Sequence, residues 1–230
     1  MNAIARVAGA MLAVTVLATA CSGSTFDPAR AKSDLQQRAE KFKMGRFDVT
    51  YRLHATSDRP ETDLTVRWML DGLDHTKAEF TRGRLVGRDL RAPLMVILGP
   101  TGGPIACSSD PNAFGGVSGS ADGVCVRGSK ASSAADVIDL ILAATIVPVA
   151  GPDLQGLEVS ARSTTSVAGK RSECFSTNAP AGQWCFGDDG TLLRASTTDD
   201  QGHVLELEAQ DLGSTPTDAD FTPPYPIVAQ

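Results

Sequence analysis

The chain has 230 residues, of which 42% are hydrophobic, 21% are charged and only 5% are aromatic. Its 21 basic and 27 acidic residues give a formal net charge of −6, and the basic residues form no cluster interleaved with aromatics. The composition therefore argues against a nucleic-acid partner, because such a protein needs a basic surface to displace counterions from phosphates.

The first 21 residues have the features of an export signal. Arg6 precedes a short apolar stretch, and small residues lead to Cys21. The apolar stretch is too short for a stable membrane span. The sequence before Cys21 resembles the bacterial lipobox, which implies cleavage before Cys21 and a diacylglyceryl thioether on it. An ordinary signal peptide, with Cys21 paired to another cysteine, is the alternative.

These features divide the chain into a signal peptide (1–20), a lipidated tether (21–28) and a single domain (29–230). Two or three acyl chains on Cys21 would hold the mature protein on the extracytoplasmic face of the cell membrane, because a single chain anchors only marginally. A domain of roughly 200 residues is long enough to bury one sizeable core.

The first half of the domain predicts one helix followed by antiparallel strands. Residues 29–43 are charged, but they place Leu35, Ala39 and Phe42 at helical spacing. From Gly45 onward, apolar and polar residues alternate with the two-residue repeat of half-buried strands. The segments expected to form strands are 47–54, 64–70, 75–81, 94–98 and 124–126.

One apolar helix is predicted in the middle of the chain. Ser133 and Asp136 have capping-box-like spacing, and the helix is expected to end near Pro148. It is apolar on two sides and needs apolar neighbours on both. It is either a core helix or a helix that lines a lipid cavity with one side. The cavity-lining candidates on the helix are Val137, Leu140, Ile141 and Ala144.

The second half repeats the strand pattern, so that roughly ten strands are expected in all. Alternation covers residues 157–161, 193–195 and 205–209, with polar turns between the strands. Residues 221–226 contain three prolines, which lack N–H donors. We expect this segment to form an extended strap along the surface. The fold class predicted is mainly β with helices (α+β).

Four cysteines remain once one carries lipid, and an even number in an exported protein predicts two disulfides. A hairpin with its loop at residues 178–181 would set Cys174 opposite Cys185, at a separation that suits a disulfide. Cys107 and Cys125 then form the second pair. Zinc binding by the four cysteines is the alternative hypothesis, but the sequence has no C-x-x-C pair and its histidines are far apart. We expect no metal and no cofactor.

No motif for catalysis is present in the sequence. Residues 116–120 have Ser in place of the last glycine of a G-x-S-x-G elbow, and neither H-E-x-x-H nor a phosphate-binding loop occurs. The acid pairs at 188–189 and 199–200 fall in predicted turns, and each histidine is isolated. The sequence therefore predicts no catalytic residue and a protein that is not an enzyme.

The order of elements resembles the LolA and LppX type of bacterial lipoproteins and lipoprotein carriers. The resemblance extends over residues 45–221, in which a meander, an apolar helix and a second meander follow one another. It implies a curved antiparallel sheet, or half-barrel, covered by the central apolar helix and the N-terminal helix. It also implies acyl-chain binding without catalytic residues. On the strands, the cavity-lining candidates by position are Tyr51, Val66 and Trp68.

The leading hypothesis is a membrane-anchored envelope lipoprotein that binds or carries a lipid or acylated molecule in an apolar cavity. The alternative is a non-enzymatic interaction or sensory lipoprotein with a filled core. It would bind an envelope protein through an exposed strand edge or through the loop between Cys107 and Cys125. A third possibility, an envelope enzyme, would require carboxylates or histidines that converge in a cleft.

Overall fold

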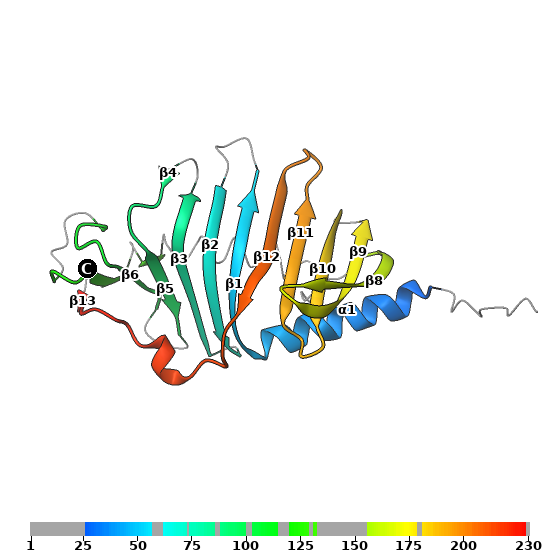
Figure 1. The fold of residues 1–230 in the computed structure, drawn as a ribbon, viewed down its shortest axis with the longest axis horizontal. Coiled ribbons are helices and arrows are strands. Elements are labelled where there is room, and N and C mark those ends of the chain that lie inside the picture. The colour runs from blue at the N-terminus through cyan, green and yellow to red at the C-terminus, as the bar shows by residue number, and fades with distance from the viewer. Residues whose placement is uncertain are drawn as a thin grey trace, which may run out of the picture.

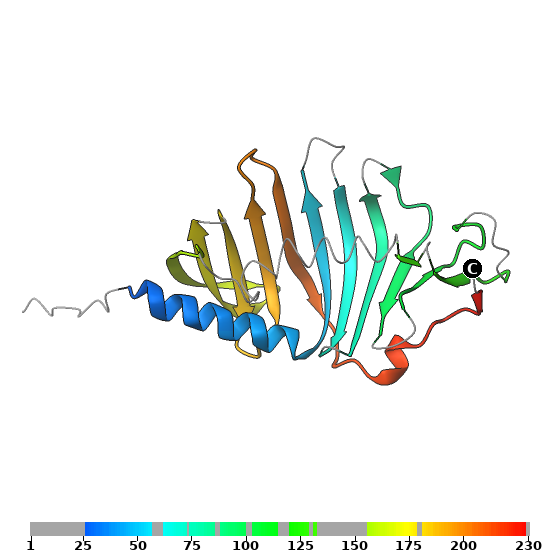
Figure 2. The ribbon, with the colours of Figure 1, turned by 180° about the vertical axis from the view of Figure 1, so that it is seen from behind.

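One curved sheet forms the body of the computed structural model, and helix α1 lies across one of its faces (Figures 1 and 2). The structure describes residues 26–56, 62–72, 74–85, 88–99, 103–114, 120–128, 131–132, 156–178 and 181–228, without the side chains of residues 85 and 88. The elements are α1 (Pro28–Lys43), β1 (Arg46–Ala55), β2 (Thr62–Asp71), β3 (His75–Leu85), β4 (Arg88–Asp89), β5 (Leu94–Leu98), β6 (Ile105–Ser108), β7 (Val124–Arg127), β8 (Val159–Val167), β9 (Lys170–Asn178), β10 (Ala181–Gly187), β11 (Leu192–Thr198), β12 (Val204–Leu212), the 3-10 helix η1 (Asp218–Phe221) and β13 (Ile227–Val228).

The described residues form a 13-stranded sheet in the order β13-β7-β6-β5-β3-β2-β1-β12-β11-β10-β9-β8, with β4 paired to β3. The two halves of the chain meet where β1 pairs with both β2 and β12. The end strands β8 and β13 do not pair with each other, so the sheet is open. The predicted α+β class with a half-barrel sheet is confirmed. Short strands β4, β6 and β13 were not predicted, because pieces of two to four residues carry too little alternation to be recognised.

Helix α1 begins one residue before the predicted start and is capped by Asp27. The Asp27 carboxylate accepts hydrogen bonds from the N–H groups of Ala29 and Arg30 at 3.0 and 3.1 Å, and Pro28 occupies the first turn. The predicted apolar side of the helix is buried, since Leu35, Ala39 and Phe42 pack into the main core together with Ala31.

The cysteine hairpin has the predicted register but a shorter loop. Cys174 lies opposite Cys185, and the pairing continues to Asn178 opposite Ala181. The loop therefore has two residues in place of the four predicted, because β9 and β10 continue their hydrogen-bonded pairing up to a two-residue turn. Both predicted disulfides are present, Cys174–Cys185 in this hairpin and Cys107–Cys125 between β6 and β7.

The C-terminal segment follows the expected strap along the sheet and then ends as a strand. The Phe221 ring packs on His75, and the Lys77 ammonium donates to the Asp220 carbonyl at 2.7 Å. Beyond the prolines, β13 pairs with β7 in parallel at the edge. The prolines of the strap precede β13, at positions where no N–H group has to donate to a neighbouring strand.

Several predictions fall outside the described residues. These are the signal peptide, Cys21, all but the last residue of the segment 116–120 and the apolar helix with Val137, Leu140, Ile141 and Ala144. Within the described part of the chain, no helix is long and apolar enough to cross a membrane.

Candidate functional site

The face of the sheet that packs against α1, here called the inner face, is apolar over most of the strands. Alternation turns every second residue of each strand to this side. These residues form one cluster with the buried side of α1, and on the strands each is at most 6% exposed. Its strand members include Val49, Tyr51, Leu53, Leu64, Val66, Trp68, Leu70, Ala78, Phe80, Val96, Phe175, Trp184, Phe186, Ala195, Leu207 and Ala209.

The structure brings Tyr51, Val66 and Trp68 together at the middle of the inner face. Tyr51 on β1 lies directly opposite Val66 on β2, and Trp68 follows Val66 on the same face of β2. The Tyr51 and Trp68 rings meet edge to face, with centroids 6.4 Å apart. The three sequence candidates on the strands are therefore neighbours. Four pockets outlined by described residues lie elsewhere, and none of these three side chains lines them.

The polar atoms of Tyr51 and Trp68 differ in their hydrogen bonds. The Tyr51 hydroxyl donates to the carbonyl of Leu192 at 2.7 Å. Burial raises the pKa of the Tyr51 hydroxyl, which keeps it protonated and able to donate. The buried Trp68 Nε1–H, in contrast, has no hydrogen-bond partner in the described structure. A buried donor without an acceptor costs about 1–3 kcal/mol, which makes this group a candidate for ligand binding.

Charged side chains meet the inner face at the end of the sheet that α1 covers. Glu173 on β9 accepts from Arg38 of α1 at 3.0 Å and also pairs with Arg162 of β8. Arg162 in turn binds Asp34 of α1 at 2.7 Å. This network attaches the helix to β8 and β9. Sequence reasoning missed it, although Asp34 and Arg38 at i, i+4 mark one side of the helix.

The opposite face of the sheet, here called the outer face, carries ion pairs between neighbouring strands. Arg67 donates to both Asp48 oxygens at 2.9 and 2.7 Å, and these bonds raise the pKa of Arg67. Arg52 binds Asp63 at 3.2 and 2.7 Å, and its hydrogen bonds lower the pKa of Asp63. These charges compensate one another across the strands and form no convergent acid–base pair.

The acid pairs noted in the sequence lie in turns, as predicted. Asp189 accepts from the Thr191 N–H at 2.9 Å and pairs with Lys170 at 3.0 Å. Asp199 accepts from the N–H groups of Gln201 and His203, both at 2.9 Å. These carboxylates hold turns in place. Over the residues with described positions, no three His, Cys, Asp or Glu side chains are grouped so that they could hold a metal ion.

Fold and site together define an α+β protein with an open antiparallel half-barrel and an apolar inner face. No protein-family model matches the sequence, and neither does any curated protein.

Solved structures with a similar arrangement exist at low identity. A crystal structure of MucB is 15% identical with a TM-score of 0.46, and the match covers 85% of this chain but only 63% of the MucB chain. LprF from Mycobacterium bovis is 11% identical with a TM-score of 0.42, covering 84% of this chain and 99% of LprF. A LolA superfamily protein from Nitrosomonas europaea is 11% identical with a TM-score of 0.34, covering 84% and 97%.

Proposed function

We propose that this protein is a non-catalytic lipoprotein of the cell envelope that binds the acyl part of a lipid or of an acylated molecule. In this proposal, lipid on Cys21 holds it on the extracytoplasmic face of the membrane. The acyl chains lie against the inner face of the sheet, in contact with Tyr51, Val66 and Trp68.

The observation that carries the proposal is the extent of the apolar inner face. The cluster members on β1, β2, β3, β5, β11 and β12 are all uncharged, and they join into one continuous surface. Burial of each methylene contributes about 0.8 kcal/mol, so ten methylenes against this surface would contribute about 8 kcal/mol, enough for micromolar binding.

The open sheet supports the proposal, because a ligand can enter without breaking any hydrogen bonds between strands. The end strands β8 and β13 are unpaired with each other, whereas a closed barrel would restrict the interior to a fixed lumen. An acyl chain therefore has only apolar contacts to displace, and apolar contacts are non-directional.

The unpaired N–H of Trp68 supports a ligand that carries an ester or amide carbonyl. Such a carbonyl would accept the hydrogen bond that the indole lacks. The predicted helix residues Val137, Leu140, Ile141 and Ala144 complete the lining in this proposal. They lie outside the described residues.

Native mass spectrometry tests this function on a Cys21→Ala form that is exported and purified from a host with an envelope. We expect a stoichiometric lipid to co-purify and to appear after organic extraction. Ala78→Phe adds a ring on the inner face and should abolish the co-purified lipid. Ala161→Phe, at an exposed position of β8, is the matched control and should retain it.

Thermal melting of both variants shows whether each has folded. Folded wild-type protein that carries no lipid and takes up no fluorescent fatty acid would overturn the proposal. If Ala78→Phe and Ala161→Phe lose the lipid equally, the ligand lies away from the inner face.

A second candidate is a protein-binding lipoprotein with a filled core. The observation in its favour is the β8 edge, which pairs only with β9 and whose residues 160–166 are all exposed. An extended segment of a partner could add to such an edge through main-chain hydrogen bonds. Failure of the lipid experiment would make this the better account.

A further inference from the structure

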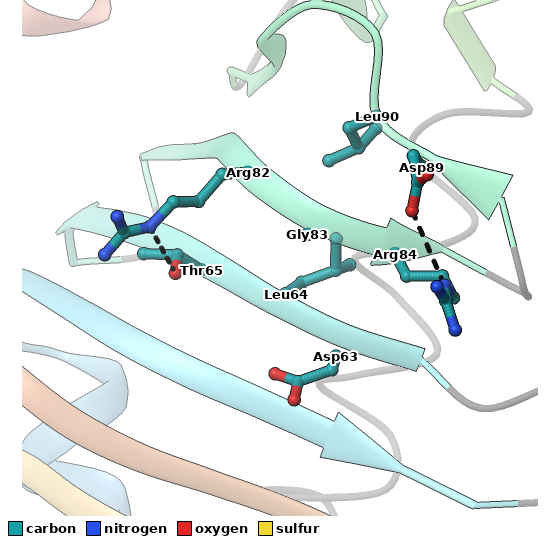
Figure 3. A pocket seen from close by; sticks show the side chains of 8 residues that line it. All are labelled: Asp63, Leu64, Thr65, Arg82, Gly83, Arg84, Asp89 and Leu90. Atoms are coloured by element: carbon teal, nitrogen blue, oxygen red, sulfur yellow. Dashed lines mark hydrogen bonds and ion pairs between the residues drawn. The ribbon is translucent and has the colours of Figure 1, made fainter.

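A pocket of about 620 Å³ lies on the outer face of the sheet, where β2 begins and β3 ends. Arg84 of β3 lies opposite Asp63 of β2, and Arg82 lies opposite Thr65. Directly opposed side chains share one face of a sheet, so both arginines are on the outer face with Asp63. Figure 3 shows the Arg82 guanidinium beside Thr65 and the Arg84 guanidinium beside Asp89 of β4, at opposite sides of the pocket.

These two arginines have weaker partners than other arginines of the outer face. Arg52 of β1 and Arg67 of β2 each bind an aspartate through two hydrogen bonds of 2.7–3.2 Å. Among the described residues, Arg82 has no acidic partner, and its Nε donates to a threonine hydroxyl at 3.5 Å. The Arg84 Nε meets Asp89 at 3.5 Å, which is long for a hydrogen bond. Both guanidinium groups therefore keep most of their N–H donors for another ligand.

Positive charge is concentrated at this end of the outer face. Arg82, Arg84 and Arg91 are exposed. The described acids beside them are Asp89, whose side chain is 83% exposed, and Asp63, which an arginine of β1 already binds. The acids of β12 lie three strands from β3, about 14 Å at the usual strand spacing, which exceeds the Debye length of about 10 Å at 0.1 M salt. The net charge of −6 on the whole chain therefore does not cancel the local positive potential.

The arrangement of the guanidinium groups suits a surface that carries many anionic groups. In Figure 3, Arg82 and Arg84 extend away from each other, so that their N–H donors do not converge on one point. A single small anion is held best by convergent donors, whereas the phosphates of a lipid surface are separate groups spread over a plane. Each guanidinium can bind one such phosphate in a bidentate manner.

We propose that Arg82, Arg84 and Arg91 dock this end of the outer face on an anionic membrane surface, where each guanidinium binds a different lipid phosphate. The attraction of each basic residue to anionic lipids adds to the binding. The inference rests on the proposed location at the membrane and not on acyl binding, because the arginines and the main core cluster lie on opposite faces of the sheet. Docking would turn the outer face of β3 toward the membrane and leave the inner face free for its ligand.

Co-sedimentation of the Cys21→Ala form with vesicles tests the docking, since this form has no lipid anchor. Vesicles of phosphatidylcholine are compared with vesicles of equal parts phosphatidylcholine and phosphatidylglycerol. The protein should bind the anionic vesicles, and less so as the salt concentration rises. Adding Arg82→Gln/Arg84→Gln should weaken this binding about 30-fold, which corresponds to about 1 kcal/mol for each basic residue.

The matched control is Arg127→Gln/Arg171→Gln, which removes the same charge from exposed positions of β7 and β9. It should bind the anionic vesicles like the parent form, and thermal melting shows whether both double variants have folded. Equal weakening in the two variants would show that binding follows net charge alone and would overturn the docking surface. If the protein binds heparin but not the anionic vesicles, the surface fits an acidic polymer and the membrane assignment is wrong.

The Ala78→Phe variant separates this inference from the proposed function. It should lose the co-purified lipid but still bind anionic vesicles, whereas the Arg82→Gln/Arg84→Gln variant should keep the lipid. If the arginine variant binds vesicles like the parent form, docking is wrong and acyl binding stands. If no lipid is bound but vesicle binding depends on the two arginines, acyl binding is wrong and docking stands.

Discussion

Tyr51 shows how a single polar residue can help to shape an apolar face. Its ring is fully buried among aliphatic and aromatic side chains, and its hydroxyl crosses the core to reach the Leu192 carbonyl of β11. A buried hydroxyl is tolerated because it has this acceptor. The bond ties β1 to the segment that opens β11, two elements far apart in the chain.

Tyr51→Phe should lower the free energy of unfolding by about 1–2 kcal/mol, because it leaves the Leu192 carbonyl without its donor. Urea denaturation measures this loss. Tyr225→Phe is the control, since Tyr225 is only half-buried and its hydroxyl makes no hydrogen bond that the structure describes; it should cost less than about 0.5 kcal/mol. Equal losses in the two variants would contradict the role given to the Tyr51 bond.

At the scale of elements, α1 is held to the sheet by both apolar and ionic contacts. Phe42 stacks on Phe47 with ring centroids 5.4 Å apart, and Arg38 donates to the Gly187 carbonyl at 2.7 Å. Glu173 lies beneath the helix, where it binds Arg38 and Arg162. The apolar stripe orients the helix, and the ion pairs fix its position along β8 and β9.

Glu173→Gln should destabilise the protein by about 1–2 kcal/mol, since it leaves the half-buried Arg38 and the more exposed Arg162 without their shared carboxylate. Amide hydrogen exchange should also become faster in α1 than in β1 and β2. Glu40→Gln, which removes an exposed ion pair with Lys43, should cost less than about 0.5 kcal/mol. Unchanged exchange in α1 of the Glu173 variant would show that apolar packing alone holds the helix.

The disulfides connect adjacent strands near opposite ends of the sheet, with sequence separations of 18 for Cys107–Cys125 and 11 for Cys174–Cys185. Replacing either pair by alanine should lower stability by about 3 kcal/mol, because loop-closure entropy depends only weakly on loop length. The two losses should add to about 6 kcal/mol in the fourfold variant, since the pairs share no neighbours. Urea denaturation of the three variants checks both statements. A large difference between the losses in the two single-disulfide variants would show that loop-closure entropy does not dominate.

At the scale of the whole molecule, charge is arranged around the open sheet so that most acids have a defined partner. Cross-strand ion pairs cover the outer face, and other acids cap turns. Hydrogen bonds from Arg52 lower the pKa of Asp63, and backbone N–H groups of His203 and Thr217 lower the pKa values of Asp199 and Asp220. The folded state therefore favours the ionised form of these acids.

This charge arrangement predicts loss of stability in acid. The unfolded chain titrates near pKa 3.9, above the lowered folded values, so it binds more protons as the pH falls. The melting temperature should hold from neutral pH to about pH 5 and decrease below about pH 4. Arg52→Gln removes the partner of Asp63 and should melt lower at pH 7 but make the decrease below pH 4 smaller. An unchanged acid slope in this variant would refute the contribution of Asp63.

The sequence predicts the parts of the fold that depend on near neighbours. The buried side of α1 follows from the helical spacing of Leu35, Ala39 and Phe42, and the alternation of β1 and β2 places Tyr51, Val66 and Trp68 on one face. The Cys174–Cys185 register follows from one hairpin. In each case the deciding contacts lie close together along the chain, so that residue spacing is sufficient to predict them.

The tertiary structure decides everything that joins distant segments. The pairing of β1 with β12, the bond from Arg38 to Glu173 and the parallel docking of β13 on β7 each connect residues about a hundred or more positions apart. Local spacing carries no information about such contacts, because the packing of the whole sheet selects them. The sequence alone therefore determined the longer strands, the helix α1 and the cysteine pairs, while the open sheet and the ion pairs between distant segments came from the packing.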